Sequence, residues 1–341
     1  MGIPVYFKTL IEDNYDICLS SDISINCDYL FLDLNCLIHP CCRGLDNEND
    51  MYETIYNSIV EIINIVKPNI LLYLAIDGPC PRQKMHQQRL RRYKSSKIKK
   101  LWDTNAITPG TVFMKNLEEY LITHLTKLNI KYILDSSNNP GEGEHKLYNY
   151  IKSNNCNNII IYGLDSDLIM LSLLLNKQVY LFRERTEYNI ENIDSKYIYL
   201  SITNLSKIII NKFKPKFYKY DDICIIYDYV FICFLLGNDF IQHTPSINLR
   251  YDGLNVILNI YNQLQLQHKG TYQLIDISSK QLIIIHNLTE LIYNLSLNEE
   301  SRIINILQIR DKQEKKYTHI LSNITNINKL EEFQNHKPII D

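Results

Sequence analysis

Short apolar runs that end at an acidic residue recur along this 341-residue chain. Four such runs end at Asp33, Asp77, the pair Asp165 and Asp167, and Asp239. Runs of this length rich in Ile, Leu and Tyr are typical of strands buried on both faces of a parallel sheet. Because the ligands of an open parallel sheet bind beyond the carboxyl ends of its strands, we expect these acids to converge on one place.

A further acidic pair, Glu142 and Glu144, opens a predicted helix and is interleaved with glycines. Two carboxylates about 4 Å apart repel by roughly 4 kcal/mol at an effective dielectric constant of 20. Seven gathered carboxylates are tolerable only with bound divalent cations or with most of them protonated. The pattern therefore predicts a two-metal phosphodiester nuclease that binds divalent cations. Any single Asp at a strand end reads equally well as a helix cap, and the pair Glu142 and Glu144 reads also as a favourable interaction with the helix dipole. The prediction therefore depends on the joint pattern.

The same apolar runs predict an α/β fold with a mostly parallel central sheet flanked by helices. We expect strands at 28–33, 70–76, 130–134, 158–163 and 178–183, and helices at 51–66, 81–102, 113–128, 143–153, 166–175, 203–212 and 222–236. Beyond residue 250 the pattern is purely helical, with helices expected at 252–265, 279–295 and 299–315. This change predicts a nuclease domain over 1–245 and a C-terminal all-helical extension over 246–341 that packs on it.

A basic segment follows closely after Asp77. Residues 82–100 contain nine Lys and Arg residues and no acid. On a helix that starts at Pro81, four donors fall on one face, because their spacing is i, i+4, i+7 and i+8; they are Lys84, Gln88, Arg91 and Arg92. Such a face can surround a terminal phosphate, although a run of charge is more often simply a solvated surface. Its place beside the acids favours a pocket for a phosphate-ended polymer.

Composition restricts the compartment more than the function. The net charge of −2 does not by itself indicate a nucleic-acid partner. Nine cysteines without a Cys-x-x-Cys pair, and no secretory signal, predict reduced thiols in the cytoplasm. The longest apolar run, 223–236, is interrupted by Asp228 and is too short to span a bilayer, so we expect no membrane partner.

Taken together, the motifs resemble the N-terminal nuclease region of the Xrn-type 5′→3′ exoribonucleases. The matching stretches, in the order in which the family has them, are Met1-Gly2-Ile3-Pro4, Leu32-Asp33-Leu34-Asn35, Ile38-His39-Pro40-Cys41, Ile76-Asp77-Gly78, Pro140-Gly141-Glu142-Gly143-Glu144-His145-Lys146, Tyr162-Gly163-Leu164-Asp165-Ser166-Asp167 and Gly237-Asn238-Asp239-Phe240. The resemblance implies a fold like that of the PIN and flap nucleases.

The resemblance also assigns roles to individual residues. It implies that the catalytic, metal-binding set is Asp33, Asp77, Glu142, Glu144, Asp165, Asp167 and Asp239. It implies that Lys84, Gln88, Arg91 and Arg92 read a 5′-monophosphate, that His39, placed in a loop, stacks on the first base, and that Asn35 belongs to the substrate-binding set. The implied substrate is single-stranded RNA with a 5′-monophosphate.

Two departures from the family pattern stand out. Where the family carries Asn-Gly, this chain carries Asn35-Cys36. The family also has a second conserved region downstream, which encloses the active site, and we expect this chain to end before it and a separate protein to supply it. A short copy in a genome rich in A and T, indicated by frequent Ile, Asn, Tyr and Lys, suggests a DNA virus of the host cytoplasm.

Two other functions stay open at this point. A structure-specific 5′ DNA nuclease of the flap endonuclease class shares a similar acidic scaffold, but usually follows its last acid with a Gly-rich hairpin that is not found after Asp239. A non-catalytic protein that binds RNA 5′ ends would need the phosphate pocket but not the acids. The intact acids favour the Mg²⁺-dependent 5′→3′ exoribonuclease.

Overall fold

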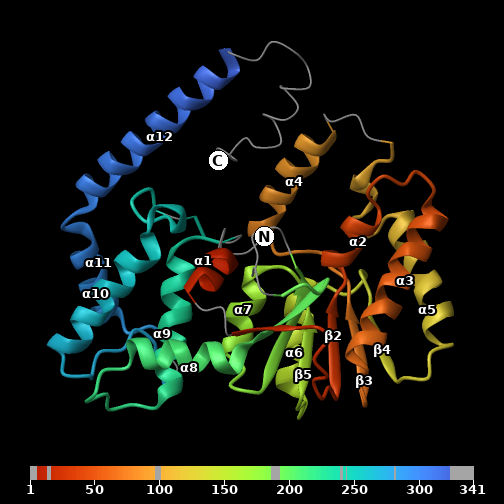
Figure 1. Ribbon diagram of the computed structural model, residues 1–341, viewed down its shortest axis with the longest axis horizontal. Helices are drawn as coiled ribbons and strands as arrows, with labels where there is room; N and C mark the ends of the chain where they lie inside the picture. The colour runs from red at the N-terminus through yellow and green to blue at the C-terminus, as the bar shows by residue number, and fades with distance from the viewer. Residues whose placement is uncertain are drawn as a thin grey trace.

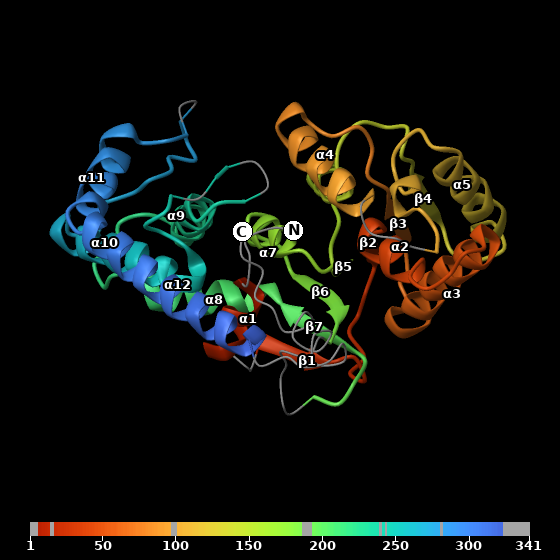
Figure 2. The same ribbon diagram turned by 90° about the horizontal axis from the view of Figure 1, so that it is seen from above.

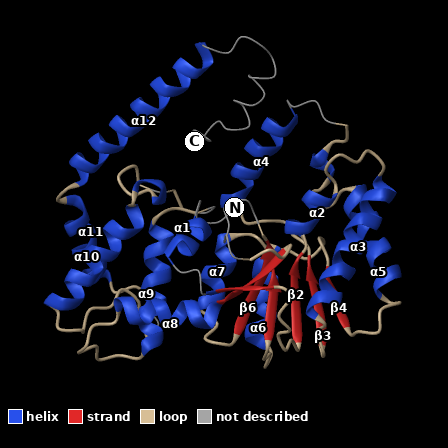
Figure 3. Cartoon of the chain, viewed as in Figure 1, coloured by secondary structure: helices blue, strands red, loops and turns tan. Residues whose placement is uncertain are grey.

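A computed structural model describes residues 6–13, 17–96, 101–185, 193–238, 241–242, 244–279 and 282–322 of the chain. Within these residues, seven strands form one sheet in the order β1-β7-β6-β5-β2-β3-β4. Figures 1 and 3 show the parallel strands of this sheet side by side. The strands are β1 (Cys18–Ser20), β2 (Tyr29–Asp33), β3 (Leu71–Ala75), β4 (Tyr132–Asp135), β5 (Ile159–Tyr162), β6 (Val179–Glu184) and β7 (Tyr197–Ser201). The strands β2 to β6 are parallel, and β7 runs antiparallel to both of its neighbours.

Helices cover both faces of the sheet and continue beyond one end of it (Figure 2). The helices are α1 (Tyr6–Asp13), α2 (Asn35–Cys41), α3 (Glu48–Val66), α4 (Arg82–Ser96), α5 (Val112–Leu125), α6 (Gly143–Ser153), α7 (Ser166–Leu173), α8 (Ile202–Phe213), α9 (Asp222–Leu235), α10 (Gly253–Gln267), α11 (Ile285–Ser296) and α12 (Glu299–Ser322), with short 3₁₀ turns η2 (Thr104–Ala106) and η3 (Leu249–Tyr251). In the described residues no helix combines the length and apolar character needed to cross a membrane.

The two faces of β2 show why the sheet is buried on both sides. Leu30 and Leu32 pack into the cluster formed with α2, α3 and α5, while Phe31 between them packs into the cluster that includes α6 and α7. All three side chains are fully buried. Burying each one stabilises the fold by about 1.5–3 kcal/mol, so the apolar run fixes β2 in the middle of the sheet, with Asp33 at its carboxyl end.

A buried hydrogen-bond network attaches the C-terminal helices to α9. Asp228, fully buried on α9, accepts hydrogen bonds from the Tyr261 hydroxyl of α10 at 2.7 Å and from the amides of Leu274 and Ile275 at 3.0 and 2.9 Å. Burial raises the pKa of Asp228 to about 7, although these three donors act in the opposite direction. The network holds α9 (Asp222–Leu235), the helix that precedes Asp239 in the sequence.

The predicted fold class is confirmed, and all five predicted strands are present with ends within two residues of those expected. The strands β1 and β7 and the helices α1 and α2 were not predicted. The prediction of a loop at His39 is wrong, because the chain enters α2 directly after Leu34. The helix expected at 279–295 starts only at Ile285. The division into domains at residue 245 stays a prediction.

Candidate active site

One cleft, with a volume of about 540 Å³, gathers every described residue that the sequence assigned to the site. These residues are Asp33, Asn35, His39, Asp77, Lys84, Gln88, Arg91, Arg92, Glu142, Glu144, Asp165 and Asp167. The remaining predicted ligand, Asp239, lies outside the described residues. The segment between α4 and α5, including Thr104 and Pro109, forms part of the wall and was not foreseen.

The sheet topology explains why the acids meet. The strands β5, β2 and β3 are adjacent and parallel, so their carboxyl ends lie side by side. Asp33 ends β2, Asp77 follows two residues after β3, and Asp165 follows shortly after β5. Glu142 and Glu144 come from the amino end of α6, which packs against β2 and β3. The carboxyl ends of these strands point toward the side of the sheet where α4 stands (Figure 1), and the acids lie at those ends.

Helix capping does not account for the acids at the helix starts. Glu142 and Asp165 occupy the N-cap positions of α6 and α7, but neither side chain makes a capping hydrogen bond. Both line the cleft instead. Neither Glu142 nor Asp165 therefore caps its helix through its side chain.

Burial places a high electrostatic cost on the cluster. It raises the pKa of Asp33 to about 7, with the neighbouring charge of Asp77 adding to the effect. The pKa of Asp77 is likewise raised by burial, and that of Glu144 is raised well above its ordinary value by burial and then by Asp167 and Asp33. Such carboxylates ionise together only when positive charge is supplied nearby.

Gly141 and Gly143, on either side of Glu142, are each glycine for a different structural reason. Gly141 has a φ of +106°, which side-chain-bearing residues rarely adopt. Gly143 lies against the carboxylates: its amide donates to Asp77 Oδ1 at 2.6 Å, and an added Cβ would lie 2.8 Å from Asp33 Oδ1. The sequence Gly-Glu-Gly-Glu thus brings the backbone of α6 close enough for its acids to join those of the strands.

The basic helix α4 faces the same cleft rather than solvent alone. Lys84 Nζ lies 2.5 Å from Glu142 Oε2, and the Lys84 side chain is only 12% exposed. Gln88 accepts hydrogen bonds from Arg92 Nη2 and Cys80 Sγ, both at 3.3 Å. Arg91 is exposed and also lines the cleft. These four side chains therefore give the cleft a cationic wall beside its acidic floor.

Asn35 and His39 both come from α2. The Asn35 side chain accepts a hydrogen bond from the Asp77 amide at 3.0 Å, and its own amide donates to Asp33 Oδ1 at 3.3 Å. Asn35 thus ties the ends of β2 and β3 together. His39 is exposed and lines the cleft. Their predicted contacts with substrate stay predictions.

The donor set fits divalent cations. Glu142 is 2% exposed, and its Oε1 atom is buried without a hydrogen-bond partner. Two groups of three side chains hold their ligand atoms within 4.8 Å of one another: Asp33, Cys36 and Asp165, and Glu142, Glu144 and His145. Carboxylate oxygens are the ligands that Mg²⁺ prefers.

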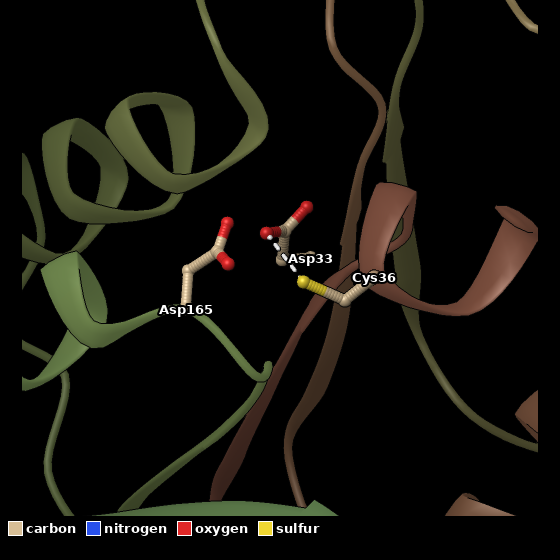
Figure 4. A group of neighbouring side chains, drawn as sticks. All are labelled: Asp33, Cys36 and Asp165. Carbon is tan, nitrogen blue, oxygen red and sulfur yellow. Dashed lines mark hydrogen bonds between the residues drawn. The ribbon is translucent and has the colours of Figure 1, made fainter. Parts of the chain in front are cut away.

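The sequence analysis assigned no role to three further residues around the site. Cys36 donates a hydrogen bond from Sγ to Asp33 Oδ2 at 3.2 Å (Figure 4). Lys146, buried, donates to the carbonyl of Ile76, which precedes Asp77, at 2.8 Å. Arg183, also buried, donates to the carbonyl of Leu164, which precedes Asp165, at 3.0 Å. Lys146 lies in the acidic motif and could have been noted there, whereas nothing local in the sequence marks Arg183.

Comparison with known protein families shows the family of this chain. A family model described as "XRN 5'-3' exonuclease N-terminus" matches residues 1–185, and one described as "Xrn1 helical domain" matches residues 219–340. The chain belongs to the XRN 5′-3′ exonuclease family. The resemblance recognised in the motifs is therefore confirmed.

Curated members of the XRN family align over most of the chain. The 5′-3′ exoribonuclease 2 of Schizosaccharomyces pombe is 30% identical over 336 residues, which cover 76% of this chain and 34% of the relative. The human 5′-3′ exoribonuclease 1 is 31% identical over 319 residues, which cover 76% of this chain and 18% of the relative. The chain thus spans about a third or less of these two relatives.

Solved structures of flap-type nucleases align more weakly with this XRN family member. The catalytic core of Rad2 with DNA gives a TM-score of 0.44 at 14% identity, covering 85% of this chain and 78% of that one. The bacteriophage T5 D15 flap endonuclease gives 0.41 at 14% identity, covering 90% and 97%. Similarity at this level carries no conclusion about substrate.

Proposed function

We propose that this chain is a Mg²⁺-dependent 5′→3′ exoribonuclease that degrades single-stranded RNA carrying a 5′-monophosphate. The observation that carries the proposal is the meeting of acidic residues and the cationic face of α4 in one cleft. An acidic cluster alone would serve many metal enzymes. A cationic wall beside it suits a substrate that presents one phosphate to be cut and another at its end.

The acids divide the work with the basic helix. Asp33, Asp77, Glu142, Glu144, Asp165, Asp167 and Asp239 would hold two Mg²⁺ ions, which Mn²⁺ could replace. The ions, when bound, supply Lewis-acid chemistry to phosphodiester hydrolysis. Lys84, Gln88, Arg91 and Arg92 bind the 5′-phosphate, so that the distance between this pocket and the acids sets the length of the product.

The other walls of the cleft orient the substrate. His39 is exposed on α2 and offers an aromatic face to the first base. Asn35 is proposed to contact substrate while it keeps the ends of β2 and β3 together. A capped or triphosphate end fits the pocket poorly, because both its size and its charge differ from those of a monophosphate.

We further propose a cellular compartment and a domain division for this chain. The sequence carries nine cysteines and no Cys-x-x-Cys pair, which agrees with a reducing compartment such as the cytoplasm. The division into a nuclease domain over 1–245 and a helical extension over 246–341 is retained as a proposal.

Three RNAs of one sequence test the proposal, with a 5′-monophosphate, a 5′-hydroxyl or a cap, each in Mg²⁺ or in chelator. The monophosphate RNA is expected to be degraded from its 5′ end only in Mg²⁺, and faster than the other two. Asp165→Ala and Asp167→Ala should each reduce cleavage by about a hundredfold or more, since each removes a proposed metal ligand.

Two outcomes would favour the other candidate functions. Preferential cutting of flapped DNA would indicate a structure-specific DNA nuclease. Tight binding of monophosphate RNA without Mg²⁺-dependent cleavage would indicate an RNA 5′-end binding protein. Equal degradation of hydroxyl and monophosphate RNA would contradict the assignment of the phosphate pocket.

A further inference from the structure

Cys36 adds a sulfur atom to the acidic floor of the cleft (Figure 4). Its Sγ lies 3.2 Å from Asp33 Oδ2, and Asp165 approaches the same point from the turn before α7. Ligand atoms of the three side chains all lie within 4.8 Å of one another. One sulfur and the oxygens of two carboxylates thus meet at one point of the cleft.

The geometry suits a small tetrahedral cation. Zinc binds sulfur at about 2.3 Å and carboxylate oxygen at about 2.1 Å, so the sulfur and oxygen ligands of one ion lie about 3.6 Å apart. The distance of 3.2 Å between Cys36 Sγ and Asp33 Oδ2 is close to that value. A cation between them requires only a small outward movement of the side chains.

A second feature of the same cleft points to cations. Glu142 Oε1 is buried without a hydrogen-bond partner, on a side chain that is 2% exposed and lines the cleft. A buried carboxylate oxygen left unsatisfied carries the full cost of its desolvation. A bound cation removes that cost, whereas a purely structural role for the acids does not.

We propose that Cys36, Asp33 and Asp165 form a binding site for a thiophilic divalent cation of the Zn²⁺ class. Mg²⁺ is a hard ion that avoids sulfur, so it gains nothing from Cys36. Zn²⁺ gains a thiolate ligand and occupies two carboxylates that Mg²⁺ needs in the proposed nuclease. Zn²⁺ therefore inhibits cleavage by competing for the same acids. The binding site stands without the proposed function, and only the inhibition rests on it.

Cadmium titration of the full chain tests the site directly, because a bound cadmium–thiolate pair absorbs in the ultraviolet. With Mg²⁺ in excess, the unaltered protein is expected to develop this absorption at one equivalent of Cd²⁺. Cys36→Ser and Cys36→Gly should each weaken that binding by about tenfold or more, since loss of even an outer partner of a metal costs about 10–100-fold. Asp165→Asn should weaken it as well.

Cys41→Ser is the matched control, because Cys41 lies on the same helix with its Sγ 3.4 Å from Ser58 Oγ and is not among the residues that line the cleft. Its cadmium binding should equal that of the unaltered protein. Circular dichroism of each variant checks the fold, and Cys36→Gly decides the result if Cys36→Ser does not fold. Equal absorption and affinity with and without Cys36 would overturn the site.

Inhibition is measured separately, as the Zn²⁺ concentration that halves cleavage of monophosphate RNA in Mg²⁺. In Cys36→Gly this Zn²⁺ concentration should be about tenfold higher than in the unaltered protein. The inhibition of each protein is measured against its own cleavage rate without Zn²⁺. Cadmium binding at Cys36 without any change in zinc inhibition would overturn the competitive effect. If no RNA is cleaved at all, the proposed function fails, while the cadmium titration still decides the metal site.

Discussion

Lys84 of the basic helix and Glu142 of the acidic cluster form a close ion pair, with 2.5 Å between Nζ and Oε2. The pair joins the cationic wall of the cleft to its acidic floor. The proposed phosphate-binding residue and the proposed metal ligand are therefore partners of one another. A cation bound by Glu142 would neutralise the carboxylate with which Lys84 pairs, and Lys84 would then be available to bind phosphate. Metal binding and phosphate binding in the cleft are therefore coupled.

Lys84→Met tests this coupling through stability. Removing one partner leaves Glu142 buried without its counter-charge, which lowers the free energy of unfolding by about 3 kcal/mol in chelator. Mg²⁺ should recover much of that loss, because it binds the folded protein and neutralises the same carboxylate. Urea unfolding in chelator and in Mg²⁺ measures both values. Lys94→Met, an exposed lysine of the same helix, should change neither by more than about 0.5 kcal/mol. An equal loss in both conditions would contradict the coupling.

Arg91→Ala combined with Arg92→Ala tests how the 5′ end is read. Both side chains line the cleft and offer charged donors to a phosphate. The double variant should degrade monophosphate and hydroxyl RNA at similar rates, chiefly because the monophosphate RNA binds about tenfold more weakly. Arg89→Ala serves as control, since Arg89 is exposed and does not line the cleft. A monophosphate preference that survives in the double variant would show that other groups read the end.

Gly143→Ala tests the close approach of α6 to the carboxylates. The added Cβ would lie 2.8 Å from Asp33 Oδ1 and 3.3 Å from Asp77 Oδ1, so the acids must move apart. We expect the Mg²⁺ concentration for half-maximal cleavage to rise about tenfold. Preference for monophosphate over hydroxyl RNA should remain, because the basic helix is not altered. An unchanged Mg²⁺ requirement would mean that the acids need not lie as close as they do.

Asp228→Asn tests the buried network beneath α10 through pH. Burial raises the pKa of Asp228 in the folded protein to about 7, above its ordinary value of 3.8. Between these values the folded protein keeps a proton that the unfolded chain has lost, so the stability of the unaltered protein falls as pH rises from about 4 to 7. The stability of Asp228→Asn should fall less steeply across this pH range. Its free energy of unfolding should therefore increase relative to that of the unaltered protein as pH rises. Urea unfolding at pH 5 and pH 8 gives the free energy of unfolding of both proteins. An equal change in this free energy between the two pH values would contradict the raised pKa of Asp228.

The meeting of the strand-end acids was predictable because each of them follows its own apolar run. Asp33, Asp77 and Asp165 each lie at or just beyond the end of a buried strand, and parallel pairing then brings those ends together. Local sequence therefore carries most of the information about the floor of the cleft. Asp239 lies outside the described residues, so its convergence with the others stays a prediction.

Other elements depend on contacts that local sequence does not reveal. The strand β1 has three residues and pairs with β7 far along the chain. The helix α2 contains Pro40 and starts after Leu34 without a side-chain cap, so the usual signals of a helix are missing. The place of Cys36 beside Asp165, and of Arg183 beneath Leu164, follows from the packing of α2, β6 and the turn before α7.

Acids distant in sequence are proposed to hold divalent cations in this cleft. A crystal soaked in Mn²⁺ and measured by anomalous scattering tests this proposal most directly. We predict manganese within bonding distance of Asp33, Asp165 and the other carboxylates of the cleft, on the side that faces α4. A well-ordered crystal in which these carboxylates bind no manganese, or lie too far apart to share an ion, would contradict the account.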